Sequence, residues 1–152
     1  MPKFILKKVV LLSVFSLPAL ADSEKNLING KLAICPDKPN CISTENSDLA
    51  PISFGTHNPE QAWAMLQACI VEQGGKIEEI RENYLWASFQ TSFFKFTDDV
   101  EARLDRENQL IQLRSASRKG YYDFNANRNR LNRLIKAFSI KLNPEQLKNT
   151  YE

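Results

Sequence analysis

Residues 94–120 read FKFTDDVEARLDRENQLIQLRSASRKG, and this stretch decides the fold. Its first half alternates between two kinds of residue, which is the period of a β-strand. One face carries Phe94, Phe96, Val100, Ala102 and Leu104, and the other carries Lys95, Thr97, Asp99, Glu101 and Arg103. The segment DRENQ supplies a turn, and residues 110–118 return with Ile111 and Leu113 on the apolar face. The pattern predicts an antiparallel hairpin over residues 93–118.

The register of this hairpin follows from its apolar face. If Leu104 lies opposite Ile111, the other pairs are Ala102 with Leu113, Val100 with Ser115, Asp98 with Ser117, Glu101 with Arg114 and Thr97 with Arg118. A slip of one residue would place Arg114 among the phenylalanines. We interpret the outer-face charges as an exposed cross-strand ladder, formed by Asp99, Glu101, Arg114 and Arg118.

A helix is predicted on each side of the strands. In THNPEQAWAMLQACIVEQGG, residues 56–75, Asn58 is the N-cap, Pro59 is the first helical residue, and two glycines end the helix. Its apolar stripe consists of Ala62, Trp63, Leu66, Cys69 and Ile70. The second helix runs from about Asn125 to Leu142. Its stripe consists of Leu131, Leu134, Ile135, Phe138 and Leu142.

Two further strands are predicted over residues 76–82 and 84–91, the second with Leu85, Ala87 and Phe89 on one side. The order helix, four strands, helix is typical of an α+β domain, with an antiparallel four-stranded sheet and the helices on one face. Residues 22–57 form an extended N-terminal arm, 58–142 the domain and 143–152 a C-terminal tail. The 152 residues suit one domain, and 43% apolar with 25% charged residues is a globular composition.

The first 21 residues, MPKFILKKVVLLSVFSLPALA, have the order of a secretory signal peptide. Three lysines precede a short apolar run, and Ala19 and Ala21 form the A-x-A ending. We expect cleavage after Ala21 and a periplasmic or secreted protein without an integral membrane segment, because no later apolar run reaches about 18 residues. Cleavage removes three lysines and no acid, which changes the net charge from +2 to −1. Nucleic acid is therefore not an expected partner.

The exported compartment favours disulfides, and the segment CPDKPNC brings Cys35 and Cys41 close together in sequence. Two prolines stiffen the interval, so a Cys35–Cys41 disulfide is predicted to pin the arm. Cys69 lies in a helical stripe and is predicted to be a small buried apolar residue. Structural zinc usually needs four ligands, and His57 is the only histidine. No calcium-loop spacing is found, and we expect neither a metal nor a cofactor.

Asp98 is unusual because its position in the alternation places it on the apolar face. A buried carboxylate needs partners, and Ser117, Asn127, Arg128 and Arg130 are the candidates. Three interpretations follow. Asp98 is a structural staple between the last helix and the sheet, or a ligand-binding or acid–base carboxylate at the edge of a pocket, or an exposed residue at a bulge.

The basic residues are concentrated late in the chain: residues 114–141 contain eight basic residues and one acid. If Arg118, Arg128 and Arg130 converge with Lys119 near the loop, they form an anion site, since guanidinium groups suit phosphate and carboxylate. Gly120 would allow close backbone approach, and the helix start would add N–H donors. The alternative is that these charges are paired internally.

Several of these residues together resemble the domain of unknown function 1499 family over residues 33–140. The matching positions are Phe96, Asp98, Asp99, Val100, Glu101, the run RSASR at 114–118, Gly120, Asp123, Asn127, Arg128 and Arg130. One departure is Asn125, where the family often has glycine. Members occur in bacterial envelopes and photosynthetic lineages, and the resemblance implies no established activity.

Three hypotheses for function remain. Catalytic templates fit poorly, because the chain has no G-x-S-x-G motif, P-loop or histidine-rich set. The first hypothesis is a non-catalytic binding module for a small anionic ligand or headgroup at the junction of sheet, loop and last helix. The second is an envelope interaction or assembly protein, with Tyr84, Trp86, Tyr121 and Tyr122 as an additional hydrophobic or partner surface. The third is an enzyme with acid–base chemistry at Asp98. The oligomeric state is left open.

Overall fold

The computed structural model describes residues 27–91 and 96–144. The strands in these ranges are β1 (Cys41–Ser43), β2 (Ile52–Ser53), β3 (Lys76–Ile80), β4 (Tyr84–Gln90), β5 (Thr97–Asp105) and β6 (Leu110–Ser117). The helices are α1 (Pro59–Glu72) and α2 (Ala126–Leu142). The proposed signal peptide, Phe94, Lys95 and most of the C-terminal tail lie outside the described residues. Neither described helix has the length and apolar character needed to cross a bilayer.

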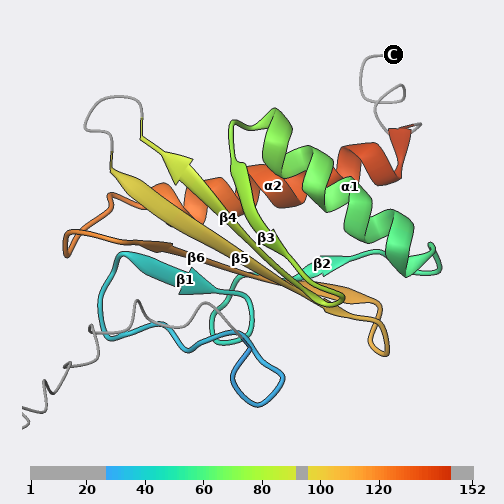
Figure 1. The fold of residues 1–152 in the computed structure, drawn as a ribbon, viewed down its shortest axis with the longest axis horizontal. Coiled ribbons are helices and arrows are strands. Elements are labelled where there is room, and N and C mark those ends of the chain that lie inside the picture. Colours follow the sequence, from blue (N-terminus) through green and yellow to red (C-terminus); the bar gives the residue numbers. More distant parts are fainter. Residues whose placement is uncertain (1–26, 92–95, 145–152) are drawn as a thin grey trace, which may run out of the picture.

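The sheet is antiparallel and has the strand order β1-β6-β5-β4-β3, with β2 also paired to β6. Both helices lie on one face of it (Figure 1). The α+β class is therefore confirmed, but the expectation of four strands is wrong. The arm adds β1 and β2 along the outer edge of β6, where Cys41 pairs with Ala116 and Ile52 with Ile111. This pairing satisfies backbone groups of β6 that would otherwise be open.

The predicted register of the β5–β6 hairpin is confirmed, from Leu104 opposite Ile111 to Asp98 opposite Ser117. Phe96 is the exception. We expected it in the core, but it precedes β5 and its side chain is 50% exposed. Its backbone carbonyl accepts from the Thr91 N–H at 2.8 Å, and its N–H donates to Thr91 Oγ1 at 3.0 Å. These bonds fix Phe96 at the end of the β4–β5 hairpin, outside the hydrophobic core.

The core lies between the helices and the inner face of the sheet. Helix α1 begins as predicted: Asn58 Oδ1 accepts from the N–H groups of Glu60 and Gln61 at 2.9 and 3.1 Å. Its five predicted stripe residues are buried. After the helix, the backbone of Gly75 passes close to Phe89 as the chain enters β3. A Cβ at this position would lie 2.5 Å from the Phe89 ring.

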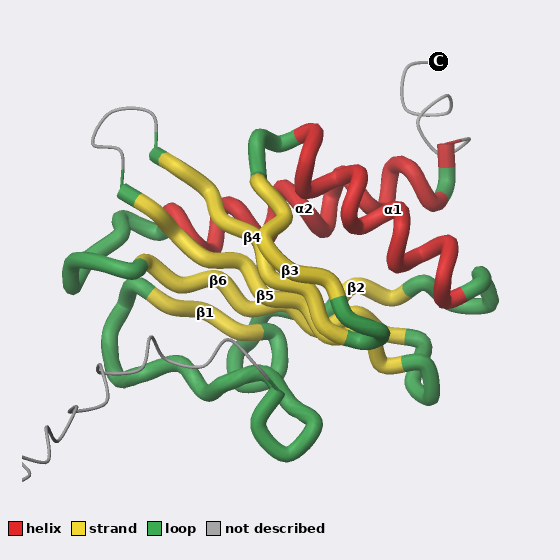
Figure 2. The backbone as a smooth tube through the Cα atoms, in the orientation of Figure 1, coloured by secondary structure: helices red, strands yellow, loops and turns green. Residues whose placement is uncertain are grey.

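The arm passes along the outer face of the sheet (Figure 2), and several side chains of this face are buried, which the alternation along the strands did not predict. Glu101 pairs with Arg114 as expected, but the Glu101 side chain is buried. Tyr84 is buried beside it and donates its hydroxyl to Glu101 Oε1 at 2.9 Å. The ladder is therefore correctly paired, but Asp99 and Glu101 are buried and only Arg118 remains exposed.

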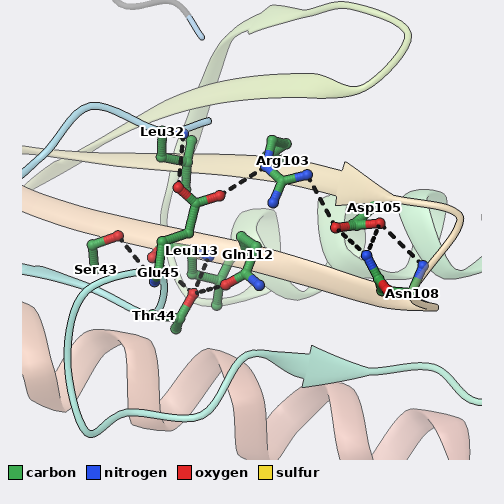
Figure 3. A network of polar contacts seen from close by, with 9 residues as sticks. All are labelled: Leu32, Ser43, Thr44, Glu45, Arg103, Asp105, Asn108, Gln112 and Leu113. Atoms are coloured by element: carbon green, nitrogen blue, oxygen red, sulfur yellow. Dashed lines mark hydrogen bonds and ion pairs between the residues drawn. The ribbon is translucent and has the colours of Figure 1, made fainter. Parts of the chain in front are cut away.

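The arm supplies part of this cover. Glu45 lies between Leu32 and Arg103 (Figure 3): it accepts from the Leu32 N–H at 3.1 Å and from Arg103 Nε at 2.8 Å. The predicted disulfide between Cys35 and Cys41 is present, with Cα atoms 5.6 Å apart. Cys69 is a free, buried thiol, and burial raises its pKa.

Candidate functional site

Asp98 and Arg130 form a buried ion pair between β5 and α2. Arg130 Nη2 lies 2.6 Å from Asp98 Oδ2, and the two residues are only 6% and 2% exposed. Arg130 Nη1 also donates to Asn127 Oδ1 at 2.7 Å and to Ser115 Oγ at 3.1 Å. The geometry supports the structural staple, and exposure at a bulge is wrong. We call Asp98, Ser115, Asn127 and Arg130 the polar staple.

Asn127 extends the polar staple to two other parts of the chain. Its Nδ2 donates to Asp123 Oδ2 at 2.7 Å and to both Ser117 Oγ and the Asn40 carbonyl at 2.9 Å. Asn40 in turn donates its side-chain amide to the Gly120 carbonyl at 2.6 Å. Asn40 precedes Cys41, so the disulfide loop is connected to the β6–α2 loop and to the start of α2.

The three arginines do not converge, which corrects the expected anion site. Arg118 lies on the outer face, where it binds Asp99 with its Nη2 at 2.9 Å from Oδ1. Arg128 pairs on the surface with Asp48 at 2.7 Å and holds the pKa of that carboxyl below its usual value. Residues two apart on a helix point to different sides, so Arg128 cannot follow Arg130 into the interior.

The start of α2 is already occupied by a carboxylate of the chain itself. Asp123 Oδ1 accepts from the Asn125 N–H at 3.0 Å, and Oδ2 accepts from the Asn127 N–H at 2.9 Å. The donors that we expected to hold an external anion are thus engaged. Asn125, at the position where the family often has glycine, adopts a left-handed conformation with φ of 62°. Asparagine tolerates this region better than most residues.

A small cavity lies at the junction of the sheet, the β6–α2 loop and α2. It has a volume of about 230 Å³, and we call it the aromatic pocket. Its lining residues are Thr91, Phe96, Asp98, Ser117, Lys119, Gly120, Tyr122, Asp123, Phe124 and Ala126. Three predicted site residues, Asp98, Ser117 and Gly120, therefore meet at one cavity. Arg118, Arg128, Arg130 and Asn127 do not line it.

The aromatic walls of this pocket were missed by sequence reasoning. Tyr122 is 68% exposed and Phe124 is 89% exposed, and their ring centroids are 6.4 Å apart. The run YYDF at 121–124 was the available signal, because three aromatic residues so close together in a loop cannot all enter a core. Only Tyr121 and Tyr122 of this run were considered, as a partner surface.

Asp98 contributes to the pocket while it holds Arg130. Its Oδ2 is engaged by Arg130, and its Oδ1 makes no hydrogen bond to any residue that the structure describes. Acid–base chemistry needs a second ionisable group in reach of a substrate. The ionisable groups that line the pocket with Asp98 are Lys119, Tyr122 and Asp123, and the Asp123 carboxylate accepts from N–H groups of Asn125 and Asn127. In residues 27–91 and 96–144, no three His, Cys, Asp or Glu side chains gather as a metal site.

Comparison with known proteins supports the resemblance that the motifs carry. A family model described as "Protein of unknown function (DUF1499)" matches residues 31–138. No curated protein and no solved structure matches the chain. The match spans the disulfide, all the described strands, the whole of α1 and most of α2, including every residue of the polar staple. The chain belongs to the DUF1499 family.

Proposed function

We propose that the protein is an exported, non-catalytic binding module that holds a small anionic ligand or headgroup at the aromatic pocket. The observation that carries the proposal is the cavity itself, where exposed Tyr122 and Phe124 surround a hollow bordered by Lys119. Small-ligand sites are typically concave and mostly apolar, with a few polar groups that fix orientation. Export is supported by the order of residues in the first 21 and by the disulfide, which suits an oxidising compartment.

The anion is assigned to Lys119 and Arg118, without Arg128 and Arg130, because those two do not line the hollow. A second hollow of about 200 Å³ adjoins the aromatic pocket and is lined by Phe96, Thr97, Arg118 and Lys119. An acidic group seated there would face an ammonium and the partly exposed Arg118 guanidinium. The apolar part of the same ligand would lie against the aromatic walls.

Isothermal calorimetry with glycerol 3-phosphate and with a short-chain phosphatidylglycerol below its micellar concentration tests this proposal. We expect saturable binding that Lys119→Ala weakens by at least tenfold. Lys136→Ala is the matched control, because Lys136 is an exposed lysine of α2 that does not line the pocket. Equal losses in both variants, or no binding by the folded protein, would contradict an anion site at Lys119.

A second candidate is an envelope interaction or assembly factor, and Tyr121 favours it. Tyr121 is 58% exposed and does not line the pocket, although its ring contacts Tyr122 at 5.6 Å. In this case a photo-crosslinker at position 121 should give one discrete adduct in cells. The adduct should persist in Lys119→Ala and disappear when Phe124 is replaced by serine. A diffuse set of adducts would argue against a specific partner.

A further inference from the structure

We infer that the aromatic pocket binds an organic ammonium group, so that the ligand is a zwitterion with its ammonium in the pocket and its acidic group at Lys119. This inference rests on the proposed function, because it uses the same pocket and specifies the chemical group at the end of the ligand opposite the acidic group. It is carried by the aromatic walls, the charges at the pocket and the size of the cavity.

The walls have the composition of an ammonium cage. Phe96, Tyr122 and Phe124 approach the cavity from the β4–β5 hairpin and from the β6–α2 loop. Aromatic faces attract organic cations, and quaternary ammonium groups in particular are bound in aromatic cages. The Tyr122 and Phe124 rings are tilted by 38° to each other, as two adjoining walls and not as a closed stack.

Phe124 is not used for packing within the fold. It is 89% exposed and is held at φ of 52°, a left-handed conformation that is costly for a bulky residue. Such strain persists only where the surrounding structure enforces it, and it is concentrated at functional sites. Here the Asp123 side chain fixes the backbone on the far side of Phe124 by accepting from the N–H groups of Asn125 and Asn127.

The charges that line the pocket leave a place for one cation. Asp98 and Asp123 both contribute to the lining. Asp98 has Arg130 as its counter-charge on Oδ2, whereas the Asp123 carboxylate accepts three hydrogen bonds from described residues, all from neutral backbone or amide N–H groups. The lining itself therefore carries two carboxylates and one ammonium group, that of Lys119. An ammonium group would balance this excess and would meet Asp98 Oδ1, to which no residue within 27–91 and 96–144 donates a hydrogen bond.

The volume fits a headgroup better than a whole metabolite. The pocket measures about 230 Å³, whereas pockets that hold drug-sized ligands measure roughly 300–1,000 Å³. A trimethylammonium or aminoethyl group enters such a cavity, and the attached phosphate or carboxylate stays outside. That position coincides with the neighbouring hollow at Arg118 and Lys119.

Calorimetry with phosphocholine and with 3,3-dimethylbutyl phosphate tests the inference directly. The two probes have the same shape, but the second has a neutral carbon in place of the charged nitrogen. We expect phosphocholine to bind at least tenfold more tightly. Phe124→Leu should weaken phosphocholine by about 2- to 30-fold, the range of one cation–π contact, and Phe124→Tyr should retain binding. Asp123→Asn keeps a capping oxygen and removes the charge. It should therefore weaken the binding of phosphocholine but not the binding of 3,3-dimethylbutyl phosphate.

The outcomes separate the inference from the proposed function. Equal binding of the two phosphates, with loss in Lys119→Ala, would overturn the ammonium site and leave the anion site standing. Binding of tetramethylammonium that depends on Phe124 but no binding of either phosphate would support the ammonium site and overturn the anion site. Thermal unfolding of each variant serves as the folding control, and Phe124 is exposed enough that its replacement should not shift the midpoint.

Discussion

Arg130 makes a contact whose loss is costly because both charges are buried. Arg130→Ala leaves the Asp98 carboxylate without its counter-charge, and Asp98 is only 2% exposed to solvent. Removing one partner of a buried pair costs about 3–5 kcal/mol. We therefore expect Arg130→Ala to lower the free energy of unfolding by about that amount, as measured by urea denaturation.

Arg128→Ala is the control for this prediction. Arg128 lies on the same helix as Arg130, but its partner is Asp48 of the arm and the pair lies at the protein surface. Its unfolding midpoint should remain that of the parent protein, because exposed pairs contribute little. The double variant Asp98→Leu with Arg130→Met should recover stability relative to Arg130→Ala. If Arg130→Ala unfolds at the same urea concentration as Arg128→Ala, the polar staple is not a stabilising element.

Tyr84 gives the protein a predictable response to alkaline pH. Its burial and the neighbouring Glu101 carboxylate raise its pKa well above the ordinary value of 10.0. Above pH 10 the unfolded chain loses this proton while the folded protein retains it, so the free energy of unfolding falls as the pH rises. The decrease from this group approaches about 1.4 kcal/mol per pH unit, and it is absent below the ordinary pKa.

Urea denaturation at pH 8 to 11 checks this response. Tyr84→Phe lacks the titrating hydroxyl and should lose stability less steeply above pH 10. Glu101 keeps its Arg114 partner in that variant, so the protein remains folded. Parallel pH profiles for the parent and Tyr84→Phe would show that the Tyr84 hydroxyl does not limit alkaline stability.

At the scale of elements, the junction of α1 and β3 requires glycine at position 75, because the space around it leaves no room for a side chain. A Cβ at Gly75 would lie 2.5 Å from the Phe89 ring and 2.7 Å from Ile70 Cγ2, and both neighbours are buried. Overpacking of this kind costs about 1–3 kcal/mol. Gly75→Ala should therefore lower the thermal midpoint of the protein.

A compensating change distinguishes a steric origin from a backbone one. Phe89→Leu removes the ring atoms that the new methyl group would meet, so the double variant should be less destabilised than the sum of the two single variants. Simple additivity of the two effects would show that the helix-to-strand turn, and not the contact with Phe89, demands glycine.

The elements that could be predicted are those with long, regular patterns. Residues 97–117 alternate over two strands, so burial of Leu104 and Ile111 determined the register of the whole hairpin. Helix α1 carries both a five-residue stripe and an Asn58 cap that agree with each other. In contrast, β1 and β2 have three and two residues, which is too short for a period to be recognised.

The candidate site was predicted in part. Alternation alone placed Asp98 inside the protein, and the chemistry of a buried carboxylate identified Arg130 among its partners. The pairing of Arg118 with Asp99 agrees with the predicted cross-strand ladder on the outer face. The destination of Arg128 could not be predicted, because Asp48 belongs to the arm. The burial of the outer face depends on arm residues such as Leu32 and Glu45, whose path has no local sequence signal.

At the scale of the whole molecule, the disulfide stabilises the fold and also connects the arm to the pocket. Closing a loop as short as that between Cys35 and Cys41 contributes about 2 kcal/mol in the chain-entropy model. Replacing both cysteines by serine should lower the free energy of unfolding by about that amount. The same decrease should follow when the parent protein is unfolded in the presence of a dithiol.

Ligand binding gives a second measurement on this double variant. The Asn40 contacts to Gly120 and Asn127 link the disulfide loop to the segment that carries Tyr122 and Phe124. We expect phosphocholine to bind more weakly to the double-serine protein at a temperature where it is fully folded. Unchanged affinity would show that the β6–α2 loop holds its conformation without the covalent constraint.

The placement of β1 and β2 on β6 has a consequence for biosynthesis. Ribosomes make the arm first, yet Cys41 has no neighbour in the sheet until Ala116 has been made. Once the chain reaches an oxidising compartment, the cysteine pair can close within its own seven residues, whereas the two short strands stay open until β6 is available. Strands of three and two residues offer nascent chains little edge on which to aggregate. The shortness of β1 and β2 thus limits aggregation of the chain until β6 is available for pairing.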